Sequence, residues 1–71
     1  MEKSKIKQII NRHFGFQQSK IDLLEYSTTI SGNSIDYVMF EVCGVEYQMN
    51  FDYSKGYFVL KVYDGHGHVE A

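Results

Sequence analysis

Asp64, His66 and His68 are the only cluster of potential metal ligands along the sequence. Two histidines separated by one residue bind Zn, Ni or Cu ions when a third ligand and supporting hydrogen bonds hold both side chains in place. Here the pair lies between glycines in residues 65–71, which we expect to form a flexible tail. We interpret His66 and His68 as a source of incidental metal affinity, and we expect the protein to need no cofactor.

A cysteine and a histidine can act as a nucleophile and its base, and the chain contains one cysteine, Cys43. We expect Cys43 to lie in a tight turn and His13 to pack beside the apolar side of a helix, so that neither is activated. Glu46 and Asp52 lie roughly 20 Å apart on one predicted strand, too far for paired acid–base chemistry. The sequence contains no phosphate-binding loop, GxSxG motif or HExxH motif. These patterns favour a protein that is not an enzyme.

Residues 2–14 have the spacing of an amphipathic helix. The stripe on one side of that helix consists of Ile6, Ile9, Ile10, His13 and Phe14. Gly15 follows the last of these residues, at the position where helices commonly end on glycine, and we expect Phe16 to pack back on the helix end. The pattern predicts a helix over residues 2–14.

Three later segments, 35–43, 45–53 and 57–63, are rich in aromatic and β-branched residues, as β-strands are. A two-residue turn at Cys43-Gly44 would pair Val42 with Val45. A second such turn at Lys55-Gly56 would pair Tyr53 with Phe58. Both registers place the apolar residues on one shared face: Val38, Phe40, Val42, Val45, Tyr47, Met49, Phe51, Tyr53, Phe58, Leu60 and Val62. Because side chains alternate with a period of two, this agreement predicts two hairpins whose shared face the helix covers.

The segment before these hairpins allows more than one register. A type II′ turn at Gly32-Asn33 would pair Tyr26 with Met39 and would bring Ile30 and Ile35 to the face opposite the core. A three-residue loop would instead place Leu24 and Tyr26 on the core face. Residues 19–22 also resemble a capping box, so a short helical turn at 19–24 is a further alternative. We predict a strand over residues 22–30.

The length of 71 residues, with 44% apolar and 23% charged residues, fits one small globular domain over residues 1–71. Together the patterns predict an α+β fold, with one N-terminal helix packed on one face of a four-stranded antiparallel β-meander. A single cysteine and the absence of an apolar leader or a long apolar segment indicate a cytoplasmic protein.

The other face of this sheet would combine tyrosines and a methionine with acidic and amide side chains. Aromatic residues and methionine are enriched at recognition surfaces, although tyrosine is also a good strand former. We therefore predict a small protein-binding module, such as an inhibitor, adaptor or assembly factor, that uses this face or an edge strand to bind a protein partner or a second copy of itself. The predicted binding residues are Tyr37, Met39, Glu46, Gln48, Asn50, Asp52, Tyr57 and Tyr63.

The alternative function is a small nucleic-acid-binding module that uses Lys3, Lys7 and Arg12 on the helix. A formal net charge of −2 argues against it, because most affinity for nucleic acid comes from neutralised phosphates. The abundance of Ile, Lys, Asn and Tyr is typical of an AT-rich genome, and it suggests the further hypothesis that the protein is encoded by a phage or prophage.

Overall fold

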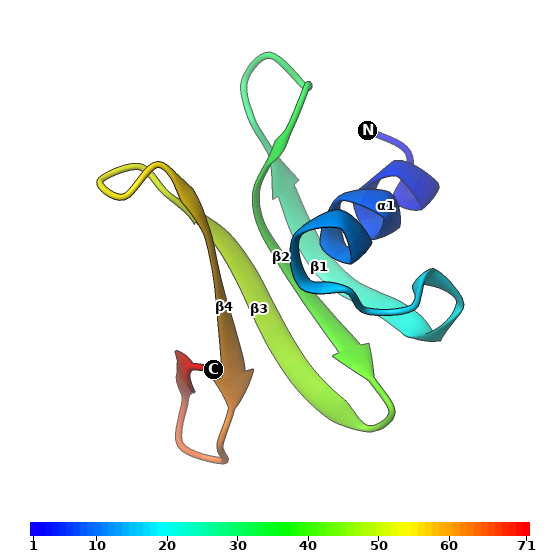
Figure 1. Ribbon diagram of the computed structural model, residues 1–71, viewed down its shortest axis with the longest axis vertical. Helices are drawn as coiled ribbons and strands as arrows, with labels where there is room; N and C mark the ends of the chain where they lie inside the picture. Colours follow the sequence, from blue (N-terminus) through cyan, green and yellow to red (C-terminus); the bar gives the residue numbers. More distant parts are fainter.

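One α-helix precedes an antiparallel sheet whose five strands follow each other in chain order (Figure 1). The computed structural model describes residues 1–71. The elements are α1 (Lys3–Phe14), the 3₁₀ turn η1 (Gln18–Lys20), β1 (Ile21–Thr28), β2 (Ile35–Val42), β3 (Val45–Asp52), β4 (Tyr57–Tyr63) and β5 (His68–Glu70). The predicted α+β class and the N-terminal helix are confirmed, and the predicted number of four strands is corrected to five.

Helix α1 ends where its sequence pattern predicts. Gly15 adopts a left-handed φ of 78°, and its N–H donates to the carbonyl of Asn11 at 2.8 Å. Ile6 and Ile10 are completely buried. Phe16 then turns back over the sheet and packs against Tyr47, with the two rings tilted and 4.8 Å between their centroids. The helix is thus fixed to the sheet by its stripe and by the residue that follows it.

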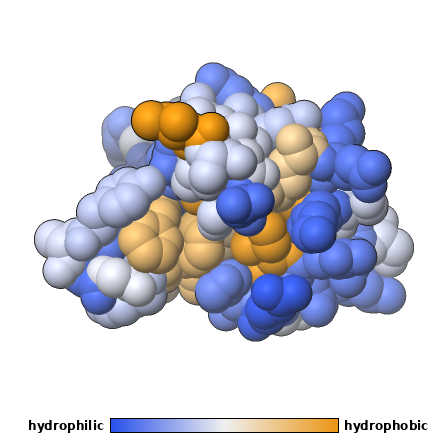
Figure 2. Space-filling model, turned by 90° about the horizontal axis from the view of Figure 1, so that it is seen from above, coloured by the Kyte–Doolittle hydropathy of each residue, from blue (hydrophilic) through white to orange (hydrophobic).

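The helix covers only part of the apolar face of the sheet. In Figure 1, α1 lies over β1 and β2, while β3 and β4 extend beyond it. The fully or almost fully buried core consists of Ile6, Ile10, Ile21, Ile35, Val38, Phe40 and Met49. Phe58 and Leu60 on β4 are only partly buried against this core, and apolar side chains remain visible between polar ones in the end view (Figure 2). The expected cover of this face is therefore complete over β1, β2 and Met49 of β3, and only partial over β4.

The hairpin between β2 and β3 has the predicted register. Val42 pairs with Val45, Phe40 with Tyr47, and Val38 with Met49. Cys43 and Gly44 form the two-residue turn, with positive φ values of 51° and 82°. Two successive positive φ values are typical of a type I′ turn, whose twist matches that of the strands it joins.

The hairpin between β3 and β4 differs from the predicted register by two residues. Phe51 pairs with Phe58 and Asp52 with Tyr57, so the connection contains residues 53–56 instead of Lys55-Gly56 alone. The Asp52 carboxylate accepts hydrogen bonds from the Ser54 N–H, at 3.0 Å, and from the Lys55 N–H, at 3.2 Å. These bonds favour the longer turn. A shift of two keeps the side chains of both strands on their predicted faces. The prediction that placed Tyr53 on the core face is wrong, because Tyr53 now lies in the connection and is 73% exposed.

Two bulges set the register of β1 against β2. Leu23 pairs with Phe40 and Glu25 with Met39, so Leu24 is an extra residue on β1. The second irregularity lies near Asp36, between the pairs Ser27–Tyr37 and Thr28–Ile35.

The strand predicted over 22–30 therefore runs over Ile21–Thr28, and a 3₁₀ turn precedes it. The prediction that placed Ile35 on the face opposite the core is wrong, because Ile35 is completely buried in the core. Tyr26 pairs with Val38, on the helix side of the sheet, and Ile30 lies fully exposed in the loop.

The last strand arises from the segment predicted to be a flexible tail. Val69 pairs with Val62, and His68 pairs with Tyr63. Between the two strands, the Asp64 carboxylate accepts hydrogen bonds from the His66 and Gly67 N–H groups at 2.9 and 3.1 Å. This Asp-centred turn reverses the chain and lets residues 68–70 add to the edge of the sheet.

Candidate protein-interaction surface

The face of the sheet that points away from α1 is called the outer face here. Cross-strand pairs bring all the predicted binding residues to it: Tyr37 pairs with Asn50, Met39 with Gln48, and Asp52 with Tyr57. Glu46 and Tyr63 share the same alternation on β3 and β4. No helix lies over this side of the sheet in Figure 1. The sequence alternation thus identified one continuous surface.

The middle of the outer face contains its least polar side chains. Met39 on β2 and Val59 on β4 are half-buried, whereas Tyr57 is 56% exposed. Tyr37 lies beside Met39 and donates a hydrogen bond from its hydroxyl to Glu25 Oε1 at 2.9 Å. This bond to a carboxylate raises the pKa of Tyr37, because it stabilises the protonated phenol. Tyr37 is thus held beside Met39 by one hydrogen bond, and tyrosine is a type of residue that anchors protein interfaces.

A row of carboxylates crosses the outer face at one end. Asp22 on β1 is directly opposite Glu41 on β2, and Glu41 is directly opposite Glu46 on β3. Like charges at directly opposed positions destabilise a sheet. No lysine or arginine forms an ion pair with any of these three residues. We call Asp22, Glu41 and Glu46 the acidic row.

His68 lies at the end of the acidic row. Its Nε2 lies 2.9 Å from Glu46 Oε2, and its ring packs against Tyr63 with 5.4 Å between centroids. The Nε2 atom is buried, and its geometry with Glu46 is not that of an aligned hydrogen bond. One glutamate of the row therefore has a potential cationic neighbour on the outer face.

The structure separates the two histidines that were considered as a weak candidate for metal binding. His66 lies exposed in the turn that Asp64 holds, while His68 is on β5 next to Glu46. Hydrogen bonds from the His66 and Gly67 N–H groups lower the pKa of Asp64, because they stabilise the charged carboxylate. No group of three His, Cys, Asp or Glu side chains is arranged to hold a metal ion.

Asn50 contributes an unpaired polar atom to the outer face. Its Oδ1 is buried and accepts no hydrogen bond. The residue lies between Tyr37 and Val59, which carry no free donor close enough to satisfy it. A buried acceptor without a partner costs about 1–3 kcal/mol of stability.

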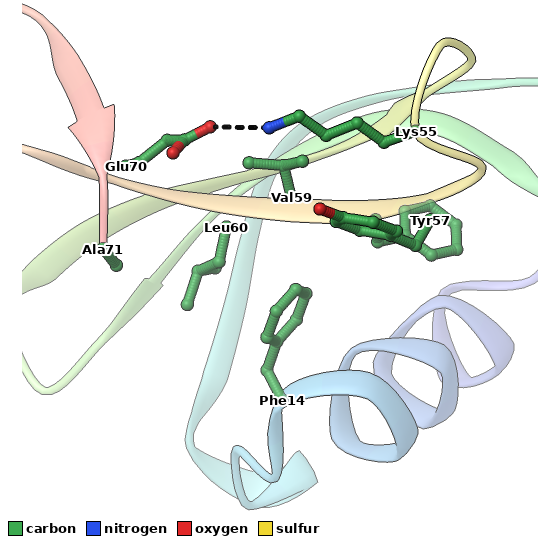
Figure 3. Close-up of a pocket in the computed structure, with 8 residues that line it drawn as sticks. Phe14, Lys55, Tyr57, Val59, Leu60, Glu70 and Ala71 are labelled. Carbon is green, nitrogen blue, oxygen red and sulfur yellow. Dashed lines mark ion pairs between the residues drawn. The ribbon is translucent and has the colours of Figure 1, made fainter.

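The largest cavity lies at the edge of β4, where β5 no longer covers it. It measures about 370 Å³ and is lined mostly by apolar side chains, including Phe14 from α1 and Phe58 and Leu60 from β4. Figure 3 shows Lys55 and Glu70 facing each other above it, and their side chains form an ion pair at 3.6 Å. Since these two charges neutralise each other, the cavity offers little to recognise a polar ligand.

The basic residues of the alternative surface do not form one cluster. Lys3 and Arg12 are exposed and Lys7 is half-buried on α1. At 100° per residue, Lys7 and Arg12 point about 140° apart around the helix axis, on opposite sides of the apolar stripe. A nucleic-acid strand would contact only part of this set at one time.

Cys43 and His13 also lie in unrelated surroundings. Cys43 is exposed in the turn between β2 and β3. The ring of His13 packs edge-on against Phe58, with 4.7 Å between centroids. The arrangement provides no hydrogen-bonded nucleophile and base.

The sequence interpretation did not place four ionisable residues on this face, namely Asp22, Glu25, His68 and Glu70. The list of predicted binding residues also lacked Glu41 and Lys61, which alternate onto the same face. Asp22 and Glu25 join the outer face through the bulge at Leu24, which places Glu25 opposite Met39. His68 and Glu70 join it through β5. The alternation of Ile21, Asp22 and Leu23 was the one signal that indicated Asp22 in advance.

Comparison of the chain with protein-family models, with curated proteins and with solved structures finds no match. None of its helices has the length and apolar character needed to cross a membrane.

Proposed function

We propose that the protein is a non-enzymatic binding module that docks another protein on the outer face of its sheet. The observation that carries this proposal is the uncovered outer face itself, with Met39, Tyr37 and Tyr57 at positions where a solvated sheet normally carries polar residues. Tyrosine and methionine are enriched at interfaces because they bury much apolar area with little loss of side-chain entropy.

The size of the outer face supports the same function. Strands of eight residues, such as β2 and β3, extend over about 26 Å, and five strands span about 24 Å. Because β5 has only three residues, the footprint is roughly 500 Å² before side-chain relief is included, comparable to the ~600 Å² that each partner contributes to the smaller stable interfaces.

The test compares a double variant of the outer face, Tyr57→Ala with Met39→Ala, and a control variant, Tyr53→Ala, in the capture of partner proteins from lysate of the source cells. Tyr57→Ala removes an aromatic side chain from the outer face. Tyr53→Ala makes the same change at a tyrosine that is 73% exposed in the connection between β3 and β4. We expect Tyr57→Ala, combined with Met39→Ala, to weaken capture at least tenfold, as loss of hot-spot residues does. Tyr53→Ala should retain it.

Circular dichroism and thermal unfolding establish that both variants remain folded. Nuclease treatment of the lysate separates direct capture from bridging by nucleic acid. Retained capture by the Tyr57/Met39 variant would refute the outer face as the docking surface. Loss of all captured protein after nuclease treatment would refute protein binding as the function.

A further inference from the structure

From the distribution of charge, we infer that the partner docks a surface rich in lysine and arginine against the acidic row. This inference rests on the proposed function and specifies the chemistry of the partner. Asp22, Glu41 and Glu46 are neighbours across three adjacent strands. Val42 and Val45 flank the two-residue turn as a hydrogen-bonded pair, so the next pair, Glu41 and Glu46, is a non-hydrogen-bonded pair, the type in which side chains lie closest.

The fold leaves this repulsion largely uncompensated although the chain contains enough cations to relieve it. Five of the seven Lys and Arg residues precede β1, at positions 3, 5, 7, 12 and 20, while eight of the nine Asp and Glu residues follow them. The sheet therefore separates a basic helix from an acidic outer face. Lys61 is the one lysine on the strands of the outer face, and it is opposite Gln48 and Glu70 rather than the acidic row.

Charge complementarity follows from this separation. A partner with lysine or arginine side chains would remove the repulsion within the acidic row when it binds, so the repulsion acts only in the free protein. Tyr63, which follows Val62 and so lies next to Glu46 in the register of β3 and β4, favours the same chemistry, because guanidinium groups stack on tyrosine faces. Nucleic acid is disfavoured at this face, since its phosphates would meet the carboxylates.

The experiment titrates the ¹⁵N-labelled full chain with an arginine-rich synthetic peptide and follows backbone amide shifts by NMR. A glutamate-rich peptide of the same length is the control probe. We expect shifts at Asp22, Glu41, Glu46 and their neighbours with the first peptide and none with the second. Glu41→Gln and Glu46→Gln should each raise the peptide Kd about twofold to fivefold, and the effect should shrink with added salt.

Glu70→Gln is the matched control variant, because its carboxylate lies on the same face but is already paired with Lys55. It should leave the peptide Kd within about 1.5-fold of the wild-type value, as expected for an exposed, partly neutralised pair. Shifts confined to α1 or to the cavity near Phe14 would overturn the inference. So would equal weakening by Glu70→Gln and Glu41→Gln.

A second copy of the chain is the competing occupant, because its basic helix could meet the acidic row. Sedimentation of the protein without peptide tests this alternative. Self-association that Glu41→Gln abolishes would overturn the inference in favour of a second copy. Capture from lysate that Tyr57→Ala abolishes but Glu41→Gln and salt leave intact would refute a basic partner while the proposed function stands.

Discussion

Glu41→Gln should stabilise the protein, although it removes a charged residue from the middle of a strand. Glu41 is directly opposite both Asp22 and Glu46, so neutralising it removes both repulsive pairs of the acidic row at once. Glutamine has a nearly identical shape, and the side chain of Glu41 makes no hydrogen bond or ion pair that would be lost. The change in stability therefore reports charge repulsion.

The magnitude follows from Coulomb's law. Two carboxylates about 6 Å apart in water repel by about 0.7 kcal/mol, and two such pairs give about 1.4 kcal/mol before screening. At about 0.01 M salt the gain in unfolding free energy should be about 1 kcal/mol, and at 0.15 M about half of that. A gain of 1 kcal/mol raises the Tm of a domain of this size by about 4–8 °C.

Urea and thermal unfolding at low and high salt measure this gain, with Glu70→Gln as the reference. Glu70 forms an ion pair with Lys55 and is opposite Lys61, so the same substitution should leave stability unchanged or lower it slightly. A Glu41→Gln protein that is less stable than the wild type would refute the reasoning, as would a gain that does not depend on salt. If stability rises while peptide affinity falls, the acidic row is retained for binding at the expense of stability.

Three further outcomes test other parts of the structure. Asn50→Val should raise the free energy of unfolding, measured by urea titration, by about 1 kcal/mol, because it removes a buried side-chain carbonyl without a donor and adds a β-branched side chain. A lower free energy of unfolding would mean that the Asn50 amide has a partner. Asp52→Ala should destabilise the turn between β3 and β4. Hydrogen bonds from the Ser54 hydroxyl and from the Ser54 and Lys55 N–H groups lower the pKa of Asp52 from its ordinary value of 3.8. The stabilisation that the charged Asp52 gives the folded protein is therefore complete above that pH, and it is lost as the pH falls through the lower folded-state pKa. Thermal unfolding of both proteins from neutral pH to about pH 2 should therefore show the two Tm values converging in acid, and a gap that stays constant would contradict the pKa shift. Ile10→Ala should lower the free energy of unfolding by about 2–5 kcal/mol, because Ile10 is completely buried. In a domain of marginal stability this loss unfolds much of the protein at 25 °C, which circular dichroism would detect.

Most of the local structure could be predicted because it depends on short-range patterns. The helix stripe, the glycine after Phe14 and the Cys43-Gly44 turn each specify one conformation from a few neighbouring residues. The register between β3 and β4 was predicted two residues away from its position, because the side-chain hydrogen bonds of Asp52 favour a longer turn. The assignment of side chains to the outer face was not affected, since a shift of two residues preserves the alternation of side chains between the two faces.

The register of β1 and the existence of β5 depended on contacts between distant segments. The bulge at Leu24 lets Leu23 face the core and Glu25 face outward, and the second bulge turns Ile35 into the core. No local pattern marks an extra residue in a strand. Residues 68–70 have weak strand propensity of their own and become a strand because the edge of β4 offers unpaired backbone groups.

The sequence alone determined the class of the fold, the two faces of the central strands and the aromatic and amide residues of the outer face, because these features need only helical or alternating periodicity. Tertiary structure decided which charges meet. The acidic row exists because β1, β2 and β3 are aligned so that Asp22, Glu41 and Glu46 are opposite one another, although they lie far apart along the chain. Cross-strand neighbours are set by register, and register depends on bulges and turns that only the packed sheet selects.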